Sequence, residues 1–462
     1  MRNILILDTG KEWGGGTNSL LELLRRIDKK KYNFTALFYY NYCKPDEIYA
    51  SLQNTMSNEN NPPTSPFNKG GQRGIIKKGV GGFSGKSDIK TEIEKLGIDF
   101  ILFKSTKQPI YAKILKEIGR AVLFFNRRLR KLYIFWIDYL FRIRKNADGL
   151  AKLLKDLNTD LLYMNNQPSS NLEGIIAAKK TGVKSLLHSR IETDLNFFEI
   201  NAVNKWLTNM ICVSEGVKEN FVRQGIEPSK CAVVYNGIDI GMVPAIPRDE
   251  IRQKFGIKED EVAIGSVGSL MKRKRFNDLV KAVAYIRAQS AEHRTQKFKN
   301  PPIPPFDKGD MNETYKLKCI IIGDGPERES LQRKIDRTGL NDRIILIGFK
   351  SDAISYMSAM DIFILPSERE GFPRVILEAM LMGKPVIASK AAGSVELVID
   401  KETGFLFHIG NTKELAERIS TLLSSPELRR EMGERGMKRV TENFSIEKYV
   451  AEVSQIFTGV AG

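Results

Sequence analysis

The stretch DIFILPSEREGFPRVILEAMLMGKPVIAS, residues 361–389, is the most informative part of this 462-residue chain for its fold. Residues 361–365, which are apolar after Asp361, predict a buried strand, and the run at 385–389 predicts a second one. Between them, residues 375–382 predict a helix, with Pro373 at a position that tolerates proline and Gly383 at the helix end. The segment therefore predicts the unit strand–loop–helix–strand.

Two carboxylates interrupt this apolar pattern. Glu378 is the only charged residue between Arg374 and Lys384, and a carboxylate on such an apolar helix is costly unless it is hydrogen-bonded. Glu370 lies beside the start of the same helix, where free backbone N–H groups and the helix dipole favour an anion. The segment therefore predicts a phosphate site flanked by two acceptors for hydroxyl groups, which matches the shape of a sugar nucleotide.

Four groups of residues in this segment match a known signature. They are Pro366-Ser367, Glu370-Gly371-Phe372-Pro373, Leu377-Glu378-Ala379-Met380 and Gly383-Lys384-Pro385-Val386-Ile387-Ala388-Ser389. Together they resemble the donor site of the retaining glycosyltransferases of family 4. The resemblance implies that Glu370 is a catalytic residue at the transferred sugar and that Glu378 binds the ribose, with Gly371, Phe372 and Arg374 also in the donor site. The alternative is a solvated loop charge at Glu370 and a lysine partner for Glu378.

The beginning of the chain carries a second candidate for phosphate binding. Residues 3–7 predict a buried strand, and a glycine-rich loop then opens a helix predicted at 19–26. Glycines in such a loop let the backbone approach a phosphate closely. The resemblance implies that Gly15 and Gly16 contact the donor diphosphate, and a merely flexible loop is the alternative.

His188 directly follows a strand predicted at 183–187. Ligands of open parallel sheets bind beyond the carboxyl ends of the strands, so this position favours a functional role. The resemblance implies a catalytic histidine close to the reacting sugar. A structural histidine is the alternative.

Prolines at 244–247 mark a linker, and a new alternation of strands and helices follows it. Its strands are predicted at 262–267, 317–322 and 343–347, before the segment already described. Strands that alternate with helices in both halves predict an α/β protein with two doubly wound parallel sheets. The resemblance implies the GT-B architecture, in which two Rossmann-like domains face a central cleft.

The resemblance also extends to the nucleotide base and the diphosphate. It implies that the base lies against the turn Gly348-Phe349 and that Lys274 binds the diphosphate. The family's usual phosphate-binding arginine is replaced by Ser269 in this chain. The basic segment 272–275 carries enough charge to compensate, and which residue does so stays open.

We expect three parts in the chain. They are an amino-terminal, acceptor-side domain at residues 1–240, a carboxyl-terminal nucleotide-sugar-binding domain at 241–440, and a terminal helix at 441–462 that packs back on the first domain. Two segments, at about 53–90 and about 291–313, contain copies of a proline-rich near-repeat. We interpret both as peptides inserted in surface loops, with a proline-rich ligand for a partner as the alternative.

The formal net charge of +17 favours an anionic partner. No helix-turn-helix, zinc-finger or RNA-binding signature is present, so we expect no nucleic acid. Residues 111–145 contain ten basic residues against two acidic ones, with aromatic residues between them at helical spacing. This pattern is typical of a helix at an anionic membrane surface. A helix with its aromatic face in the core and its basic face solvated is an equal alternative.

Other features of the sequence bear on localisation. The four cysteines are scattered without metal spacing, which is typical of reduced thiols in the cytosol. There is no signal-peptide pattern and no apolar stretch as long as a membrane span. We therefore expect a cytoplasmic protein, and a peripheral one on the cytoplasmic face of the inner membrane if the basic helical region meets lipid.

The expected function is that of a retaining glycosyltransferase. It would move a hexose from a nucleotide diphosphate sugar to a glycan or lipid-linked acceptor, in the biosynthesis of cell-envelope polysaccharide or lipopolysaccharide. We expect no metal and no cofactor, because the chain lacks an Asp-x-Asp motif and lysines and helix dipoles would stabilise the leaving diphosphate. The alternatives are a nucleotide-sugar isomerase or hydrolase on the same fold and, less favoured, a basic nucleic-acid-binding protein.

Overall fold

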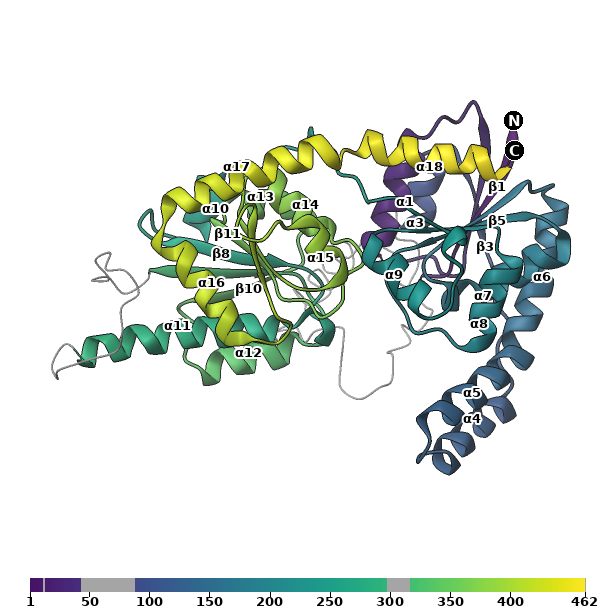
Figure 1. Ribbon diagram of the computed structural model, residues 1–462, viewed down its shortest axis with the longest axis horizontal. Helices are drawn as coiled ribbons and strands as arrows, with labels where there is room; N and C mark the ends of the chain where they lie inside the picture. Colours follow the sequence, from purple (N-terminus) through teal and green to yellow (C-terminus); the bar gives the residue numbers. More distant parts are fainter. Residues whose placement is uncertain (11–12, 43–87, 297–315, 462) are drawn as a thin grey trace, which may run out of the picture. The chain divides into compact units, whose positions relative to one another are not determined.

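The computed structural model describes residues 1–10, 13–42, 88–296 and 316–461 (Figure 1). Within these ranges the chain forms two compact units. Unit 1 comprises the described residues up to 237 together with 446–461, and unit 2 comprises those from 238 to 445. Each unit contains one parallel sheet with helices on both faces (Figure 1).

Unit 1 contains a seven-stranded sheet in the order β3-β2-β1-β4-β5-β6-β7. The strands are β1 (Arg2–Asp8), β2 (Tyr32–Phe38), β3 (Asp99–Leu102), β4 (Leu161–Asn165), β5 (Lys184–Ser189), β6 (Asn209–Cys212) and β7 (Cys231–Val233). The strand order reverses between β1 and β4, which pair in register from Ile4 opposite Leu161. Such a reversal opens a crevice at the carboxyl ends of the two strands, where α/β proteins bind ligands.

Most helices of unit 1 cover the two faces of this sheet (Figure 1). The helices of this unit are α1 (Gly15–Arg26), α3 (Ile89–Glu94), α4 (Ile110–Val122), α5 (Arg127–Asp138), α6 (Arg144–Asp156), α7 (Pro168–Thr181), α8 (Phe197–Trp206), α9 (Glu215–Arg223) and α18 (Ile446–Ala461), with the π-helical turn η1 (Tyr139–Ile143) and the 3-10 turn η2 (Pro228–Lys230). Although α18 ends the described chain, its buried residues Tyr449, Val453 and Phe457 belong to the same core as β1 and α1.

Unit 2 contains a six-stranded sheet in the order β10-β9-β8-β11-β12-β13. The strands are β8 (Val262–Val267), β9 (Leu317–Ile322), β10 (Ile344–Gly348), β11 (Ile362–Leu365), β12 (Val386–Ser389) and β13 (Gly404–Phe407). The helices are α10 (Arg248–Lys254), α11 (Phe276–Gln296), α12 (Arg328–Arg337), α13 (Ala353–Ser358), α14 (Arg374–Leu381), α15 (Ala392–Leu397), α16 (Thr412–Ser424) and α17 (Pro426–Asn443), with the 3-10 turn η3 (Lys272–Lys274). Here the strand order reverses between β8 and β11.

The structure confirms the predicted fold class of two doubly wound parallel sheets. The segment 361–389 forms β11, α14 and β12, each within one residue of the predicted bounds at its ends. All residues of β11 and β12 are buried because helices cover both faces of a parallel sheet. One boundary was wrong. The helix predicted from residue 19 begins at Gly15, so both glycines of the predicted phosphate loop lie in its first turn.

Residues 111–145, the basic and aromatic region, form several helices, whereas the sequence pattern predicts one helix. The helices α4 and α5 form an antiparallel pair that extends away from the sheet of unit 1 (Figure 1). Gly119 allows their close approach, since a Cβ atom at this position would lie 2.1 Å from the ring of Tyr133. Among the described residues, no helix combines the length and the apolar character needed to cross a membrane. The predicted insertions at about 53–90 and about 291–313 fall mostly outside the described residues.

A buried carboxylate fastens the base of this helix pair to unit 1. Glu173 on α7 is 3% exposed, and its Oε1 accepts a hydrogen bond from Nη1 of Arg142 at 2.5 Å. Its Oε2 accepts from Nδ2 of Asn146 at 3.0 Å and from the hydroxyl of Tyr39. Burial raises the pKa of Glu173, and the charge of Arg142 lowers it. The π-helical turn η1 therefore carries the arginine that ties the helix pair to α7.

We predict that Glu173→Ala lowers the free energy of unfolding by about 2 kcal/mol, because three donors lose their acceptor in a buried place. This figure is at the low end because Arg142 is itself 38% exposed. Urea denaturation followed by circular dichroism measures it. The matched control is Glu117→Ala on α4, whose pair with Arg120 is solvent-exposed and should change stability by less than about 0.5 kcal/mol. Equal effects of the two variants would contradict the anchoring role.

Candidate functional site

The reversal point of the unit 2 sheet brings together two of the predicted site residues. Lys274 follows β8 in η3, and Glu370 follows β11, 96 residues further along the chain. The Nζ atom of Lys274 donates to Oε1 of Glu370 at 2.5 Å, and the two side chains are 11% and 9% exposed. Each charge therefore compensates the other in a site that is largely shielded from water.

Glycines shape the backbone around this pair. Gly268, at the end of β8, has a φ of +156°, and a Cβ atom there would lie 3.7 Å from Nζ of Lys274. Gly393, in the first turn of α15, donates its N–H to the carbonyl of Glu370 at 3.1 Å. A Cβ atom on Gly393 would lie 2.1 Å from the carbonyl oxygen of Gly371, so only glycine fits. The loop that carries Glu370 and Gly371 is thus held directly against another backbone segment.

Glu378 on α14 differs from Glu370 in having no compensating contact. Its side chain is half-buried, and among the described residues no group donates a hydrogen bond to its carboxylate. Burial raises the pKa of Glu378, and the charge of Arg374, one helical turn earlier, lowers it. Arg374 itself has a buried Nη1 atom without a hydrogen-bond partner in the described chain. In the described chain, a half-buried carboxylate without a protein donor and a buried guanidinium nitrogen without an acceptor therefore lie one turn apart on the same short helix.

The predicted base-binding turn lies along the same edge of the sheet. Gly348 ends β10 with a φ of +86°, and its carbonyl accepts from the N–H of Gly323, after β9, at 2.9 Å. A Cβ atom on Gly323 would lie only 2.0 Å from the carbonyl oxygen of Gly268. The half-buried Phe349 follows directly. The backbones of Gly348, Gly323 and Gly268 are therefore in contact, and they link the predicted base-binding turn to the surroundings of Lys274.

The structure also shows what surrounds the missing arginine. Ser269 is exposed, and Arg273 extends toward the loop of Glu370. Nη1 of Arg273 donates to the carbonyl of Arg369 at 3.3 Å, and the N–H of Glu368 donates to the carbonyl of Arg273 at 2.7 Å. Arg273 thus contacts the loop that carries Glu370, and Arg374 follows that loop in the sequence. Both are cations that could replace the missing arginine.

Unit 1 contains the other predicted residues, Gly15, Gly16 and His188. A Cβ atom on Gly16 would lie 3.3 Å from Cγ of Arg190, whereas one on Gly15 would meet no atom within 4 Å. His188 is fully buried, and its Nδ1 lies 2.8 Å from the hydroxyl of Tyr163. Burial and the nearby Arg190 hold the pKa of His188 well below its usual value, so the imidazole is neutral. The buried Nε2 has no partner in the described chain, and the catalytic role of His188 stays a prediction.

Three polar residues beside these positions were not predicted from the sequence. Asp8, at the end of β1, is 1% exposed and accepts from Nδ2 of Asn165 at 2.7 Å and from the N–H of Gly10 at 2.6 Å. Nε of Arg190 donates to Oδ1 of Asn165 at 2.8 Å. Each of these residues ends or directly follows a strand, and this is the signal that could have identified them.

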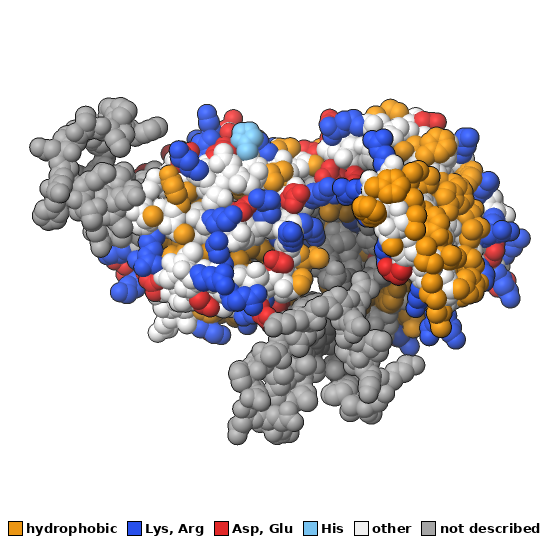
Figure 2. Space-filling model, turned by 90° about the horizontal axis from the view of Figure 1, so that it is seen from below, with side chains coloured by type: hydrophobic (Ala, Val, Ile, Leu, Met, Phe, Trp, Pro, Cys, Tyr) orange, Lys and Arg blue, Asp and Glu red, His pale blue; other side chains and the backbone are white. Residues whose placement is uncertain are grey.

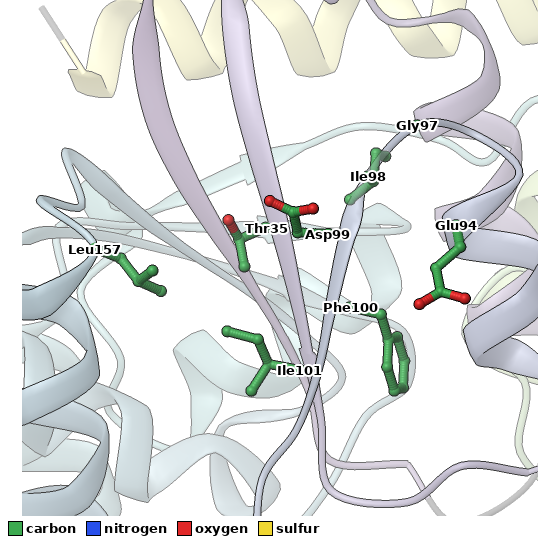
Figure 3. Close-up of a pocket in the computed structure, with 8 residues that line it drawn as sticks. All are labelled: Thr35, Glu94, Gly97, Ile98, Asp99, Phe100, Ile101 and Leu157. Atoms are coloured by element: carbon green, nitrogen blue, oxygen red, sulfur yellow. The ribbon is translucent and has the colours of Figure 1, made fainter.

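A cavity of about 630 Å³ lies elsewhere in unit 1, beside the edge strand β3 (Figure 3). It is lined by Thr35, Glu94, Gly97, Ile98, Asp99, Phe100, Ile101 and Leu157. Asp99 is the first residue of β3, so the cavity extends to the amino-terminal end of the strand. Because sheets of this kind bind ligands at the carboxyl ends of their strands, this cavity is not the candidate donor site.

Two family models match the chain. The model of the family "Glycosyltransferase Family 4" matches residues 88–241, and that of "Glycosyl transferases group 1" matches residues 247–439. The second range contains the paired Lys274 and Glu370 as well as Glu378.

Two curated relatives are similar over part of the chain. N-acetyl-alpha-D-glucosaminyl L-malate synthase of Bacillus anthracis is 28% identical over 242 residues, which cover 52% of this chain and 57% of the relative. UDP-Gal:alpha-D-GlcNAc-diphosphoundecaprenol alpha-1,3-galactosyltransferase of Escherichia coli is 26% identical over 363 residues, covering 74% and 87%.

A solved structure shows the same fold at low sequence identity. It is HepE of Anabaena in complex with UDP, which is 20% identical with a TM-score of 0.66 and covers 99% of this chain and 100% of its own. The two family models, the parallel sheets and the donor-site signature thus agree along the chain. The protein belongs to the glycosyltransferases of group 1 and family 4, and it is an enzyme with the GT-B fold.

Proposed function

We propose that this glycosyltransferase moves a hexose, with retention of anomeric configuration, from a nucleoside diphosphate sugar to an acceptor hydroxyl. The observation that supports it best is the contrast between two carboxylates at one sheet edge. Glu370 is compensated by Lys274 at 2.5 Å, whereas Glu378 is half-buried and has no donor among the described residues. A sugar nucleotide would supply ribose hydroxyls to Glu378, sugar hydroxyls to Glu370 and phosphate to the basic groups.

In this proposal the basic residues stabilise the negative charge of the leaving diphosphate. When the bond between the sugar C1 and the diphosphate oxygen breaks, the leaving diphosphate gains negative charge. Lys274 has three N–H donors, so it contacts Glu370 with one and keeps others for phosphate. Arg374, with an unpartnered Nη1, and Arg273 supply further positive charge in place of the missing arginine at position 269. Donors held ready in a shielded site stabilise such charge without reorganisation.

Retention follows from attack on the same face of the sugar. The acceptor hydroxyl forms the new bond to C1 on the face from which the diphosphate departs, and its proton passes to the diphosphate oxygen that leaves. Glu370 then orients the hexose through its hydroxyl groups and stabilises the positive charge that develops on the ring. No protein nucleophile and no metal is required by this route.

The acceptor is a glycan or a lipid-linked glycan in our proposal. The E. coli relative is named for a diphosphoundecaprenol-linked acceptor, and a relative at 26% identity from Staphylococcus aureus is named as a capsular polysaccharide biosynthesis glycosyltransferase. We therefore propose work in cell-envelope polysaccharide or lipopolysaccharide biosynthesis, at the cytoplasmic face of the membrane.

We predict that Glu378→Gln makes the unliganded protein more stable and nucleotide binding weaker. A carboxyl group whose pKa is raised by folding reduces stability at neutral pH, and this penalty disappears below its unfolded pKa of about 4.3. The gain should therefore be seen at pH 7 and vanish near pH 4. The loss of a charged acceptor for the ribose should reduce affinity for UDP or GDP, whichever stabilises the native protein, by about tenfold to a hundredfold. Thermal-shift titration measures both effects, and unchanged nucleotide affinity would contradict the ribose role.

We predict that Glu370→Gln has the opposite profile. The amide oxygen of glutamine still accepts from Lys274, so folding and affinity for the nucleoside diphosphate should stay within about twofold of native. Transfer should fall by about a hundredfold, because the negative charge that stabilises the sugar in the transition state is lost. Product analysis with a labelled sugar nucleotide gives the rate. If Glu370→Gln and Glu378→Gln weaken nucleotide binding equally, the division of roles between the two residues is wrong.

A further inference from the structure

The helix pair α4–α5 carries large apolar side chains that the rest of the protein does not cover. Figure 2 shows them as a continuous hydrophobic area on unit 1. The exposed residues of this apolar face are Ile110, Tyr111, Ile114, Leu115, Ile118, Val122, Phe124, Phe125, Leu129, Leu132, Trp136 and Leu140. Phe124 and Phe125, which lie in the turn between the helices, are 74% and 70% exposed. Monomeric proteins rarely expose so many adjacent apolar side chains unless they serve an interaction.

The spacing of these residues defines one face of each helix. On α4, Ile110, Ile114, Ile118 and Val122 recur every four residues. On α5 and the turn after it, the residues recur at intervals of three and four, at 129, 132, 136 and 140. The opposite side of α4, at Ala112 and Gly119, is buried. On α4 the apolar face is therefore the side opposite the buried residues. On α5 its edge reaches unit 1, because the ring of Trp136 lies 5.8 Å from that of Phe198 on α8, measured between centroids.

The aromatic residues of α5 and η1 do not all belong to this face. Phe135 and Tyr139 pack against Phe198 of α8, with ring centroids 5.6 Å and 5.1 Å apart. Lys116 of α4 is paired with Asp138 of α5 at 2.9 Å. The helix pair is thus already folded and fixed in place, so an occupant of its apolar face need not induce its structure. Neither alternative from the sequence is complete. Phe135 and Tyr139 are packed against unit 1, whereas Phe124, Phe125 and the aliphatic side chains beside them are exposed.

Charge identifies the kind of occupant. Between residues 110 and 140 the chain has seven basic residues and two acidic ones. The basic residues are Lys113, Lys116, Arg120, Arg127, Arg128, Arg130 and Lys131. Two copies of this face would bring like charges together, which disfavours a dimer. An anionic lipid surface matches both properties, because its phosphates attract the basic residues while its acyl chains accept the apolar ones.

We propose that the α4–α5 pair inserts its apolar face into the boundary between headgroups and acyl chains of an anionic bilayer. The proposed function supplies only the purpose of this membrane contact, which is to bring the enzyme to an acceptor held in the membrane. Phe124, Phe125 and the aliphatic side chains enter the bilayer to a depth of about 5–10 Å. The basic residues beside them contact lipid phosphates. Binding therefore has an electrostatic part that salt weakens and an apolar part that salt does not weaken.

The test measures sedimentation of the full-length protein with vesicles of phosphatidylglycerol and phosphatidylcholine, compared with phosphatidylcholine alone. The native protein should bind the anionic vesicles and keep a measurable part of this binding at about 1 M salt, where the Debye length is only about 3 Å. The triple variant Ile114→Gln, Ile118→Gln and Phe125→Gln removes apolar surface without changing the charge. Its partition into the vesicles should fall by about tenfold or more at both salt concentrations.

Two further variants separate the contributions. Arg127→Gln, Arg128→Gln and Lys131→Gln should lose the additional binding that the native protein shows at low salt and keep the salt-resistant part. The matched control, Ile240→Gln, Val243→Gln and Met437→Gln, removes exposed apolar side chains from unit 2 and should bind as the native protein does. Binding by the first triple variant equal to that of the control, or no binding by the native protein, would overturn the proposal.

Two other readouts keep the outcome clear. The competing occupant of the apolar face is a second copy of the protein. Analytical ultracentrifugation of the native protein and the apolar variant, without lipid, tests for it. If the native protein is a dimer and the variant is not, the face belongs to a second copy and the proposal is overturned. Affinity for the nucleoside diphosphate should be native in all variants, because none of the substituted residues is among the predicted donor-binding residues. Transfer with normal affinity but without vesicle binding would reject only this inference, whereas absence of any transfer by the native protein would reject the proposed function.

Discussion

Parallel strands must be joined by crossover connections, and this constraint organises both units. Each connection is a helix that covers the sheet, so the strands are buried on both faces and only their ends reach functional loops. Where the strand order reverses, two neighbouring loops leave in opposite directions and open a crevice. In unit 2 this occurs between β8 and β11, and residues 96 positions apart in the sequence therefore meet as the pair Lys274–Glu370. In unit 1 it occurs between β1 and β4, and Asp8 meets Asn165 there.

The two carboxylates of unit 2 show how differently a protein can treat buried charge. Glu370 has a lysine at 2.5 Å, so its cost in the unliganded protein is small. Glu378 has only the more distant charge of Arg374, and burial raises its pKa. Selection for stability alone would favour replacing such a residue. Residues that reduce stability are often kept where activity needs them. The cost at Glu378 is what our proposed ribose contact would explain, whereas the compensation at Glu370 alone would also fit a structural ion pair.

Unit 1 combines a rigid polar network with an exposed apolar face. The network around Arg190 and Asn165 lies at the carboxyl ends of the central strands, and His188 is buried beside it. At the other extreme, α4 and α5 leave twelve large apolar side chains exposed, although Glu173 and the rings around Phe198 hold the pair firmly to the unit. Rigid attachment and an uncovered apolar side are the combination that an interfacial anchor requires.

The sequence by itself determined most of the strands and the family, and it singled out the two glutamates that we predict for the donor site. The apolar run 362–365 has the length of a buried strand and ends at Pro366, and the residues around Glu370 and Glu378 form a signature within 24 positions of the chain. The start of α1 was missed because glycines at 15 and 16 weaken the local helix signal, while packing of the later leucines stabilises the helix. Only the tertiary structure could pair Lys274 with Glu370 or gather Asp8, Asn165 and Arg190, because strand order is not encoded in local periodicity. It alone also decided which side of the α4–α5 pair is exposed, since periodicity shows that a helix has an apolar face but not what that face touches.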